Sequence, residues 1–515
     1  MKDNLKKTNA IYWSSGIVSI CGIIYEVLFG AAGSYILGDG IKQYTLTISL
    51  FLTGMGIGAY LSEKVTKNLI ASFAWIEMLI ALIGGFSIFL LFGVTAFLSD
   101  GTDALFLYFV TLLVGCLTGV ELPILIRKAN EIGEQLNRST ARVLFSDYAG
   151  GLIGGLLFAF ILRPQLGLVK TAFVVAFINA CVALWLIFYF KDELKRVNLH
   201  RSAGILIILL LAGGVAFGEE MAFSFEQKLY RDPIVYNEQT QYQQIILTKE
   251  QGDLRLFLDG QLQFSSADEY RYHETLVHPA MAQSNNRKNV LILGGGDGLA
   301  ARELLKYDDV ESITLVDLDP KVVEMAKTNH DLAELNNHSL LDDRVNVIHQ
   351  DAFKFLEETS DFYGVILVDL PDPNNETLNK LYTLEFYQLI RNHLQPGGSV
   401  MIQATSPTFA TEVYWGINKT VQETGLETSN LHVDIPSFGD WGFVLAKREP
   451  IEWDNINISV QTSFLTEEVL HGLRTFGKDI DEHIVNEKGE QVELTVNTLI
   501  NPILIQKYLE AWQHY

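Results

Sequence analysis

Seven apolar stretches within the first 218 residues constrain the fold of this chain more than any other feature. A membrane-spanning helix needs roughly 20 predominantly apolar residues, and most of the seven stretches approach or exceed that length. The last stretch is the shortest and also fits a helix lying at the membrane interface. The sequence therefore predicts an N-terminal bundle of transmembrane helices, with spans at approximately 11–37, 44–62, 72–98, 104–126, 147–163, 168–190 and 203–218.

Charge divides the chain into two parts. Residues 1–217 hold 16 Lys and Arg against 13 Asp and Glu, a net charge of +3. Residues 218–515 hold 22 against 48, a net charge of −26, and the two parts sum to −23. The acidity of the second part argues against nucleic-acid binding and suits a cationic ligand. All three cysteines lie in the apolar stretches, and no His or Cys set has metal-ligand spacing, so no metal site is predicted.

Three glutamates lie within or near the ends of the apolar stretches. Glu26, Glu77 and Glu121 would be costly to bury as carboxylates inside a bilayer. Such residues indicate a path or a site for an organic cation. The alternative for Glu77 and Glu121 is a position close enough to an interface to be solvated.

A glycine-rich break follows an apolar run at Val290–Gly298, which reads VLILGGGDG. Glycines directly after a buried strand allow backbone N–H groups and the next helix to approach a ligand closely. Asp297 stands where a dinucleotide-binding fold would place the pyrophosphate, and a carboxylate repels phosphate but attracts a cation. The motif therefore favours a sulfonium nucleoside of the S-adenosylmethionine type over NAD or ATP.

Carboxylates follow four of the predicted strands. Asp297 ends the first strand, and Asp317 ends the second about 20 residues later, where a carboxylate would hold a ribose diol. Asp351 ends the third strand, where it would accept from an adenine amino group, and Asp369 and Asp372 end the fourth. Any single one of them could instead cap a helix. Four in register favour a ligand site at the carboxyl ends of a parallel sheet.

Strand-like and helical segments alternate through the acidic part. Short β segments around an Asp259-Gly260 turn predict a small β-domain. From residue 289 onward, strands alternate with helices predicted at 300–307, 321–328, 384–394 and 411–424. This alternation is typical of a mostly parallel sheet covered on both faces.

These motifs together resemble the spermidine synthase (polyamine aminopropyltransferase) family over residues 228–447, and the whole chain resembles its multi-pass membrane-fused branch. The matching strings are YQQI at 242–245, LDG at 258–260, DEYRYHE at 268–274, GGGDG at 294–298, VDLD at 316–319, DAF at 351–353, DLPDP at 369–373 and GFVLA at 442–446. The resemblance implies a transmembrane domain over 1–218, a connector and small β-domain over 219–285, and an α/β Rossmann-like methyltransferase-fold catalytic domain over 286–515.

The resemblance also implies a role for each matching residue. Asp372, helped by Tyr272, would be the base and orienting group for the attacking amine. Asp297 would bind the aminopropyl amine of decarboxylated S-adenosylmethionine. The other cosubstrate-binding residues would be Gln243, His273, Gly294, Gly296, Asp317, Asp351 and Ala352, and the acceptor-binding residues would be Asp369, Gln403 and Asp440.

Three positions depart from the usual family pattern. Asp317 replaces a glutamate, Leu370-Pro371 replaces two serines, and Ile435 stands where a tyrosine usually precedes Pro-Ser-Gly. The last of these segments normally contacts the acceptor amine, so the acceptor pocket should be more apolar than in soluble relatives. A distal ammonium would then need an acid, and Asp440 is the nearest in sequence.

The expected function is a membrane-anchored aminopropyltransferase. It would move the aminopropyl group of decarboxylated S-adenosylmethionine to a diamine such as putrescine, giving spermidine and methylthioadenosine, with no tightly bound cofactor. Two alternatives remain: an S-adenosylmethionine-dependent methyltransferase on the same fold, and a polyamine transporter or sensor whose soluble domain only binds. Expected partners are polyamines, nucleosides, a lipid membrane and further copies in a homodimer or higher homo-oligomer.

The orientation in the membrane follows from the basic residues. Lys and Arg are concentrated at the N-terminus and in alternate loops, which predicts a cytoplasmic N-terminus. Seven complete crossings would then place the acidic domain outside the cell membrane. Because adenosyl cosubstrates are made inside cells, we expect the seventh stretch not to cross fully and the catalytic domain to be cytoplasmic.

Overall fold

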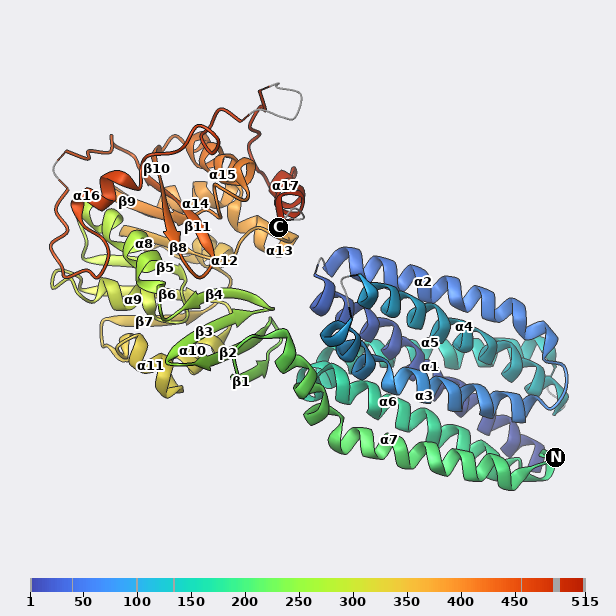
Figure 1. The fold of residues 1–515 in the computed structure, drawn as a ribbon. Coiled ribbons are helices and arrows are strands. Elements are labelled where there is room, and N and C mark those ends of the chain that lie inside the picture. Colours follow the sequence, from blue (N-terminus) through green and yellow to red (C-terminus); the bar gives the residue numbers. More distant parts are fainter. Residues whose placement is uncertain are drawn as a thin grey trace. The chain divides into compact units, whose positions relative to one another are not determined.

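The computed structural model describes residues 2–38, 40–98, 101–132, 135–454, 456–484 and 491–512. The chain divides into two compact units at Pro233 and Ile234 (Figure 1). This division lies about 15 residues beyond the predicted boundary at 218, because the last long helix of the first unit continues to Glu226.

In its described residues, the first unit is built from seven long helices. They are α1 (Lys2–Leu37), α2 (Gly40–Leu61), α3 (Leu69–Phe97), α4 (Thr102–Glu131), α5 (Leu136–Leu157), α6 (Arg163–Tyr189) and α7 (Val197–Glu226). Within the described ranges, six helical stretches are long and apolar enough to cross a membrane, with α5 and α6 counted as one stretch. A π-helical turn at Phe158–Leu162 and a non-helical Gly167 (φ 65°) interrupt that stretch. The predicted helical bundle is confirmed.

Glycines bring helices α2 and α4 into direct backbone contact. A Cβ atom on Gly58 would lie 1.9 Å from the carbonyl oxygen of Cys116, and one on Gly119 would lie 2.1 Å from that of Met55. Any larger side chain would therefore force the two helices apart. Such close approach of small residues is a common way for helices to pack when both are surrounded by apolar material.

The part of the second unit that the structure describes contains two sheets. The smaller is antiparallel, in the order β1-β2-β3-β4, with bounds Ile234–Gln239, Gln244–Glu250, Asp253–Leu258 and Gln261–Ser265. The larger has the order β10-β11-β9-β8-β5-β6-β7. Its strands are β5 (Asn289–Gly294), β6 (Ser312–Asp317), β7 (Val345–His349), β8 (Tyr363–Asp369), β9 (Leu394–Gln403), β10 (Glu427–Ile435) and β11 (Gly439–Lys447). Strands β5 to β9 are mutually parallel, and β11 is antiparallel to both of its neighbours.

Helices cover both faces of the larger sheet, as predicted. Along β5, Val290 and Ile292 pack into one hydrophobic core and Leu291 and Leu293 into the other, because successive side chains of a strand point to opposite faces. The helices are α8 (Glu269–Gln283), α9 (Leu299–Leu304), α10 (Pro320–Thr328), α11 (His330–Leu335), α12 (Ala352–Glu358), α13 (Glu376–Asn379), α14 (Leu384–His393), α15 (Thr411–Glu423), α16 (Glu467–Gly472) and α17 (Ile503–Trp512). The α/β domain and the small β-domain before it are therefore both present.

The C-terminal segment from residue 451, for which the sequence made no functional prediction, is tied to the domain by a buried acid. Glu274 of α8 is 1% exposed. Its carboxylate accepts hydrogen bonds from the backbone N–H groups of Ser463, Phe464 and Leu465 at 2.6, 2.9 and 2.8 Å. The acid thus satisfies three backbone donors, of which that of the buried Leu465 would otherwise lack a partner.

Candidate active site

The strand order brings the predicted glycines and acids together. Because β5 lies between β6 and β8, the carboxyl ends of all three meet at one edge of the sheet. A Cβ atom on Gly294, whose φ is 89°, would lie 1.9 Å from the carbonyl oxygen of Asp369, and one on Gly296 would lie 2.5 Å from Oδ2 of Asp317. Only glycine fits this turn, so the backbone closes directly onto the two acids.

Asp317 is held rigidly at the end of β6. One carboxylate oxygen accepts from the backbone N–H of Gly296 at 3.1 Å and the other from that of Asp319 at 2.9 Å. Burial raises the pKa of Asp317 to about 6. Gln243, in the loop after β1, reaches toward the same strand end, where its side-chain amide donates to Asp319 at 3.2 Å. The small sheet therefore contributes to the rim of the site.

Asp297 and His273 face each other across the glycine turn. His273 is buried on α8, with Nδ1 2.8 Å from the Glu269 carboxylate. Burial lowers the pKa of His273, but the hydrogen bond and charge of Glu269 outweigh it and raise the pKa to about 9. Burial raises the pKa of Asp297, and the His273 charge opposes that rise. Asp297 also accepts from the backbone N–H of Leu299 at 2.8 Å, as a helix cap would.

Tyr272 pairs with Asp369. Its hydroxyl donates to Oδ1 of Asp369 at 2.6 Å. The sequence-based expectation gave Tyr272 to Asp372 instead, and the structure corrects that pairing, because Asp369 is the residue at the very end of β8, opposite α8. Burial and the neighbouring Asp297 charge raise the pKa of Asp369 to about 6.

Asp372 lies in a separate network of donors and is 6% exposed. Thr405 donates to Oδ2 at 2.7 Å, and the Gln403 amide donates to Oδ1 at 3.1 Å. Tyr508 of α17 lies close enough to lower the pKa of Asp372 as well. Burial raises the pKa of Asp372, and these hydrogen bonds oppose the rise.

Sequence reasoning missed two residues beside Asp372. Thr405 adopts φ 58°, an unusual value for a β-branched residue, in the turn that follows β9. Tyr508 lies on the last helix. Neither belongs to a local motif, and only the position of Gln403 at the end of β9 could be predicted.

The remaining predicted residues lie farther from these networks. Asp351 caps α12 by accepting from the backbone N–H of Lys354 at 3.1 Å and also pairs with Lys380 at 2.6 Å, while Ala352 is buried at the start of that helix. Both carboxylate oxygens of Asp351 therefore have structural partners. Adenine binding by Asp351 and Ala352 stays a prediction.

Asp440 also has partners of its own. Its carboxylate lies 2.7 Å from Nδ1 of His432 and accepts from the Thr408 hydroxyl at 2.7 Å. Its contacts among the described residues are thus outside the Asp369 and Asp372 networks. A role in binding a distal amine stays a prediction, and such an amine would have to compete with His432.

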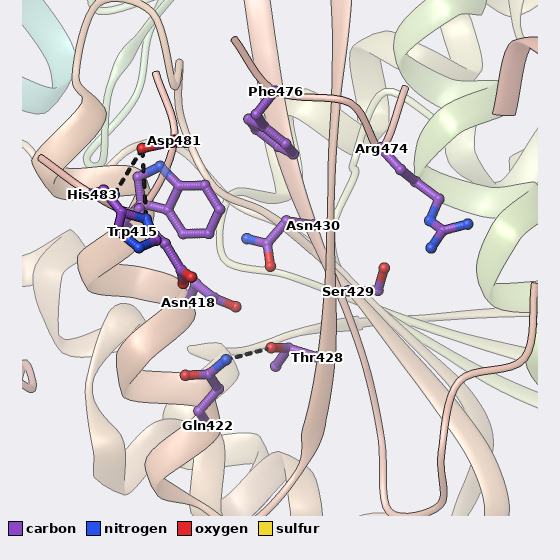
Figure 2. Close-up of a pocket in the computed structure, with 11 residues that line it drawn as sticks. Trp415, Asn418, Gln422, Thr428, Ser429, Asn430, Arg474, Phe476, Asp481 and His483 are labelled. Carbon is purple, nitrogen blue, oxygen red and sulfur yellow. Dashed lines mark hydrogen bonds and ion pairs between the residues drawn. The ribbon is translucent and has the colours of Figure 1, made fainter. Parts of the chain in front are cut away.

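A polar hollow of about 480 Å³ lies elsewhere, along the outer edge of β10 (Figure 2). It is lined by Trp415, Asn418 and Gln422 of α15, by residues 428–430 of β10, and by the C-terminal segment. Strands β11 and β9 separate β10 from β8, and none of the predicted site residues lines this hollow. It is therefore distinct from the acid site.

The fold and the acid site define a class of protein. A parallel α/β sheet ends in a glycine turn that excludes side chains, beside several buried carboxylates and a single imidazolium. This is an α/β domain of the Rossmann-like type with an acidic edge at the carboxyl ends of its parallel strands. In the described part of the chain, no three His, Cys, Asp or Glu side chains are placed to hold a metal ion.

Comparisons with known proteins specify the class further. Residues 269–455 match the family model described as the spermine/spermidine synthase domain. The chain is 63% identical over 511 residues to a polyamine aminopropyltransferase of Oceanobacillus iheyensis, covering 99% of each, and 40% identical to one of Leptospira interrogans, covering 98% of each. The chain therefore belongs to the polyamine aminopropyltransferase family and is an enzyme of that class.

Solved structures are also similar to part of this chain. A spermidine synthase in complex with the transition state analogue AdoDATO has 24% sequence identity and a TM-score of 0.45, covering 47% of this chain and 85% of that one. The spermidine synthase from Thermotoga maritima has 23% identity and a TM-score of 0.43, with the same coverage.

Proposed function

We propose that this enzyme transfers the aminopropyl group of decarboxylated S-adenosylmethionine to a diamine such as putrescine, and that its helical unit anchors it in a membrane. The products would be spermidine and methylthioadenosine. The observation that carries the proposal is the Tyr272–Asp369 pair beside Asp297, because it places a buried proton acceptor next to a second acid suited to an ammonium group. Family membership favours aminopropyl transfer over methyl transfer and over a sensor that only binds.

The reaction needs a base. An alkyl ammonium is not nucleophilic, so the acceptor nitrogen must lose a proton before it attacks the propyl carbon bonded to the sulfonium. A new C–N bond forms, the C–S bond breaks, and its electron pair leaves on sulfur as neutral methylthioadenosine. Asp369 would receive the proton, since its raised pKa makes it a stronger base than an exposed carboxylate. Asp372, which already accepts hydrogen bonds from Gln403 and Thr405, would orient the amine.

The cosubstrate would bind across the ends of β5 and β6. Asp297 would hold the ammonium of the aminopropyl group, and Asp317 the ribose. The glycine turn would let the nucleoside approach the backbone, and Gln243 and His273 would line its edges. Polyamines and nucleosides are thus the proposed small-molecule partners, and no tightly bound cofactor takes part.

The test is an assay of the full-length protein in detergent or lipid nanodiscs. It would be incubated with decarboxylated or ordinary S-adenosylmethionine and with putrescine, cadaverine, spermidine or a monoamine, and methylthioadenosine and the alkylated amine would be quantified. We expect spermidine from putrescine with the decarboxylated cosubstrate only. Methyl transfer from ordinary S-adenosylmethionine, or equal rates with a monoamine, would contradict the proposal. Light scattering on the same sample would check the proposed homo-oligomer.

A further inference from the structure

A buried arginine joins helix α8 to helix α9. Arg302 lies on α9, the helix that follows the glycine turn, and its side chain is 10% exposed. Its two terminal nitrogens, Nη1 and Nη2, donate to the two carboxylate oxygens of Glu269 on α8 at 2.8 and 3.0 Å. The Glu269 side chain is buried as well. Two parallel hydrogen bonds between a guanidinium and a carboxylate fix the orientation of both groups, not only their separation.

The remaining donors of Arg302 are also engaged. Nη1 donates to the carbonyl oxygen of Leu335 at 3.0 Å, and Nε donates to the Glu303 carboxylate at 3.0 Å. The other oxygen of Glu303 lies 3.0 Å from Nε2 of His278, which is also on α8. The guanidinium therefore holds the first turn of α8 directly and, through Glu303, a second point farther along the same helix.

The first turn of α8 also carries Tyr272, one helical turn after Glu269. The Tyr272 hydroxyl donates to Oδ1 of Asp369 at 2.6 Å. At the other end of the Arg302 contact, α9 begins directly after the glycine turn that carries Asp297. A contact that fixes α8 against α9 therefore fixes the place of Tyr272 relative to Asp297.

We propose that Arg302 is a positioning residue, which holds α8 so that the Tyr272 hydroxyl stays on the Asp369 carboxylate during aminopropyl transfer. This inference rests on the proposed role of Asp369 as the base. Burial and the Asp297 charge raise the pKa of Asp369. The His273 charge and the Tyr272 hydrogen bond lower that pKa.

The pH dependence of the reaction should report on this positioning. If α8 moves, the Tyr272 hydroxyl no longer stabilises the ionised carboxylate of Asp369, and the pKa of Asp369 rises further. The base then stays protonated up to a higher pH. The fall in kcat/KM on the acidic side should therefore begin at a higher pH than in the wild-type enzyme.

The test is Arg302→Lys in the full chain, assayed with decarboxylated S-adenosylmethionine and putrescine between about pH 5 and 8. Lysine keeps the positive charge beside Glu269 but cannot make two parallel hydrogen bonds to it. We expect kcat/KM for putrescine to fall roughly tenfold or more, because Tyr272 is misplaced. We also expect the midpoint of the acidic fall to rise by about one pH unit.

The matched control is Arg344→Lys. Arg344 makes the same kind of two-nitrogen contact, in this case with Asp342 at 3.0 and 3.1 Å in the segment before β7. The control should keep both the wild-type kcat/KM and the wild-type midpoint.

A second comparison introduces Arg302→Lys into a Tyr272→Phe enzyme. The hydroxyl is already absent there, so Arg302→Lys should raise the midpoint no further if the two residues act through one contact. Two outcomes would overturn the inference: a wild-type midpoint in Arg302→Lys, which would mean that Arg302 only stabilises the fold, or an equal rise in both backgrounds. Failure of the proposed function looks different, because the wild-type enzyme would then produce no spermidine, or Tyr272→Phe alone would leave the midpoint unchanged.

Discussion

Asp369 and Asp372 are three positions apart in the chain but have different surroundings. Asp369 accepts from the Tyr272 hydroxyl, whereas Asp372 accepts from both Thr405 and Gln403. Each donated hydrogen bond stabilises the ionised carboxylate and weakens it as a base. The difference in the number of donors therefore supports a division of labour, with Asp369 as base and Asp372 as the orienting group.

This division predicts a pH dependence. Because the pKa of Asp369 is raised from its usual value to about 6, the basic form dominates only above that pH. We expect kcat/KM for the acceptor to fall below about pH 6 by roughly tenfold per unit, and Asp369→Asn to lower kcat by roughly 10²–10⁴-fold. Release of methylthioadenosine between pH 5 and 8 measures both. Asp372→Asn should keep the fall in kcat/KM at acidic pH and mainly raise KM for the amine. If Asp372→Asn abolished that fall instead, Asp372 would be the base and Asp369 the orienting group.

Asp297 offers a second prediction at this scale. Decarboxylated S-adenosylmethionine carries a free amine that methylthioadenosine lacks. Asp297→Ala should therefore weaken the binding of decarboxylated S-adenosylmethionine much more than the binding of methylthioadenosine. Isothermal titration with both ligands measures the two affinities. Equal weakening would mean that Asp297 only shapes the glycine turn, through its hydrogen bond to Leu299.

At the scale of helices and strands, the sequence predicted those elements that local patterns encode. The strand ending at Gly294 and the helices at 320–328, 384–393 and 411–423 lie where period and composition placed them. The acids at the ends of β5, β6 and β8 meet because parallel strands share one edge. The partner of Tyr272 was misassigned because residues 370–375, after β8, follow an irregular path that no periodicity describes.

The C-terminal segment shows where such prediction ends. Tyr508 and Asp372 are 508 − 372 = 136 positions apart, and no local pattern around either residue indicates the other. The same is true of Glu274 and the backbone of residues 463–465. Contacts of this kind depend on tertiary packing, which a single sequence does not display.

The Glu274 contact gives a prediction for the stability of these elements. Glu274→Ala would leave the backbone N–H group of the buried Leu465 without an acceptor, at a cost of roughly 1–3 kcal/mol, whereas those of the exposed Ser463 and half-buried Phe464 could turn to water. We expect a clear fall in the thermal midpoint of the detergent-solubilised protein. The midpoint of Glu274→Gln, which keeps one acceptor oxygen, should fall less. A midpoint unchanged in both variants would show that the 463–465 segment contributes nothing to stability.

At the scale of the whole molecule, the length of helix α7 bears on which side of a membrane the second unit would lie. The helix has 30 residues, enough to cross a bilayer. Its uncharged part between Arg201 and Glu219 has 219 − 201 − 1 = 17 residues, or about 26 Å at 1.5 Å per residue, slightly less than a hydrocarbon core of about 30 Å. Length therefore leaves both an incomplete and a complete crossing open, and the need for an intracellular cosubstrate favours the former.

We predict that the catalytic unit is cytoplasmic. A cysteine introduced at the exposed Lys288 should react with a membrane-impermeant maleimide only after cells are permeabilised. A cysteine at the exposed Gly101, in the loop between α3 and α4, should react in intact cells. Labelling at Lys288→Cys in intact cells would place the catalytic unit outside and require seven full crossings.

The distance in sequence between Glu274 and Leu465 also sets an order of events during biosynthesis. The two residues are 465 − 274 = 191 positions apart, so at about 5–20 residues per second Leu465 leaves the ribosome's catalytic centre roughly 10–38 s after Glu274. Throughout that interval the Glu274 carboxylate lacks the backbone donors that it has in the folded enzyme. The packing around α8 is thus completed only after most of the chain has been made.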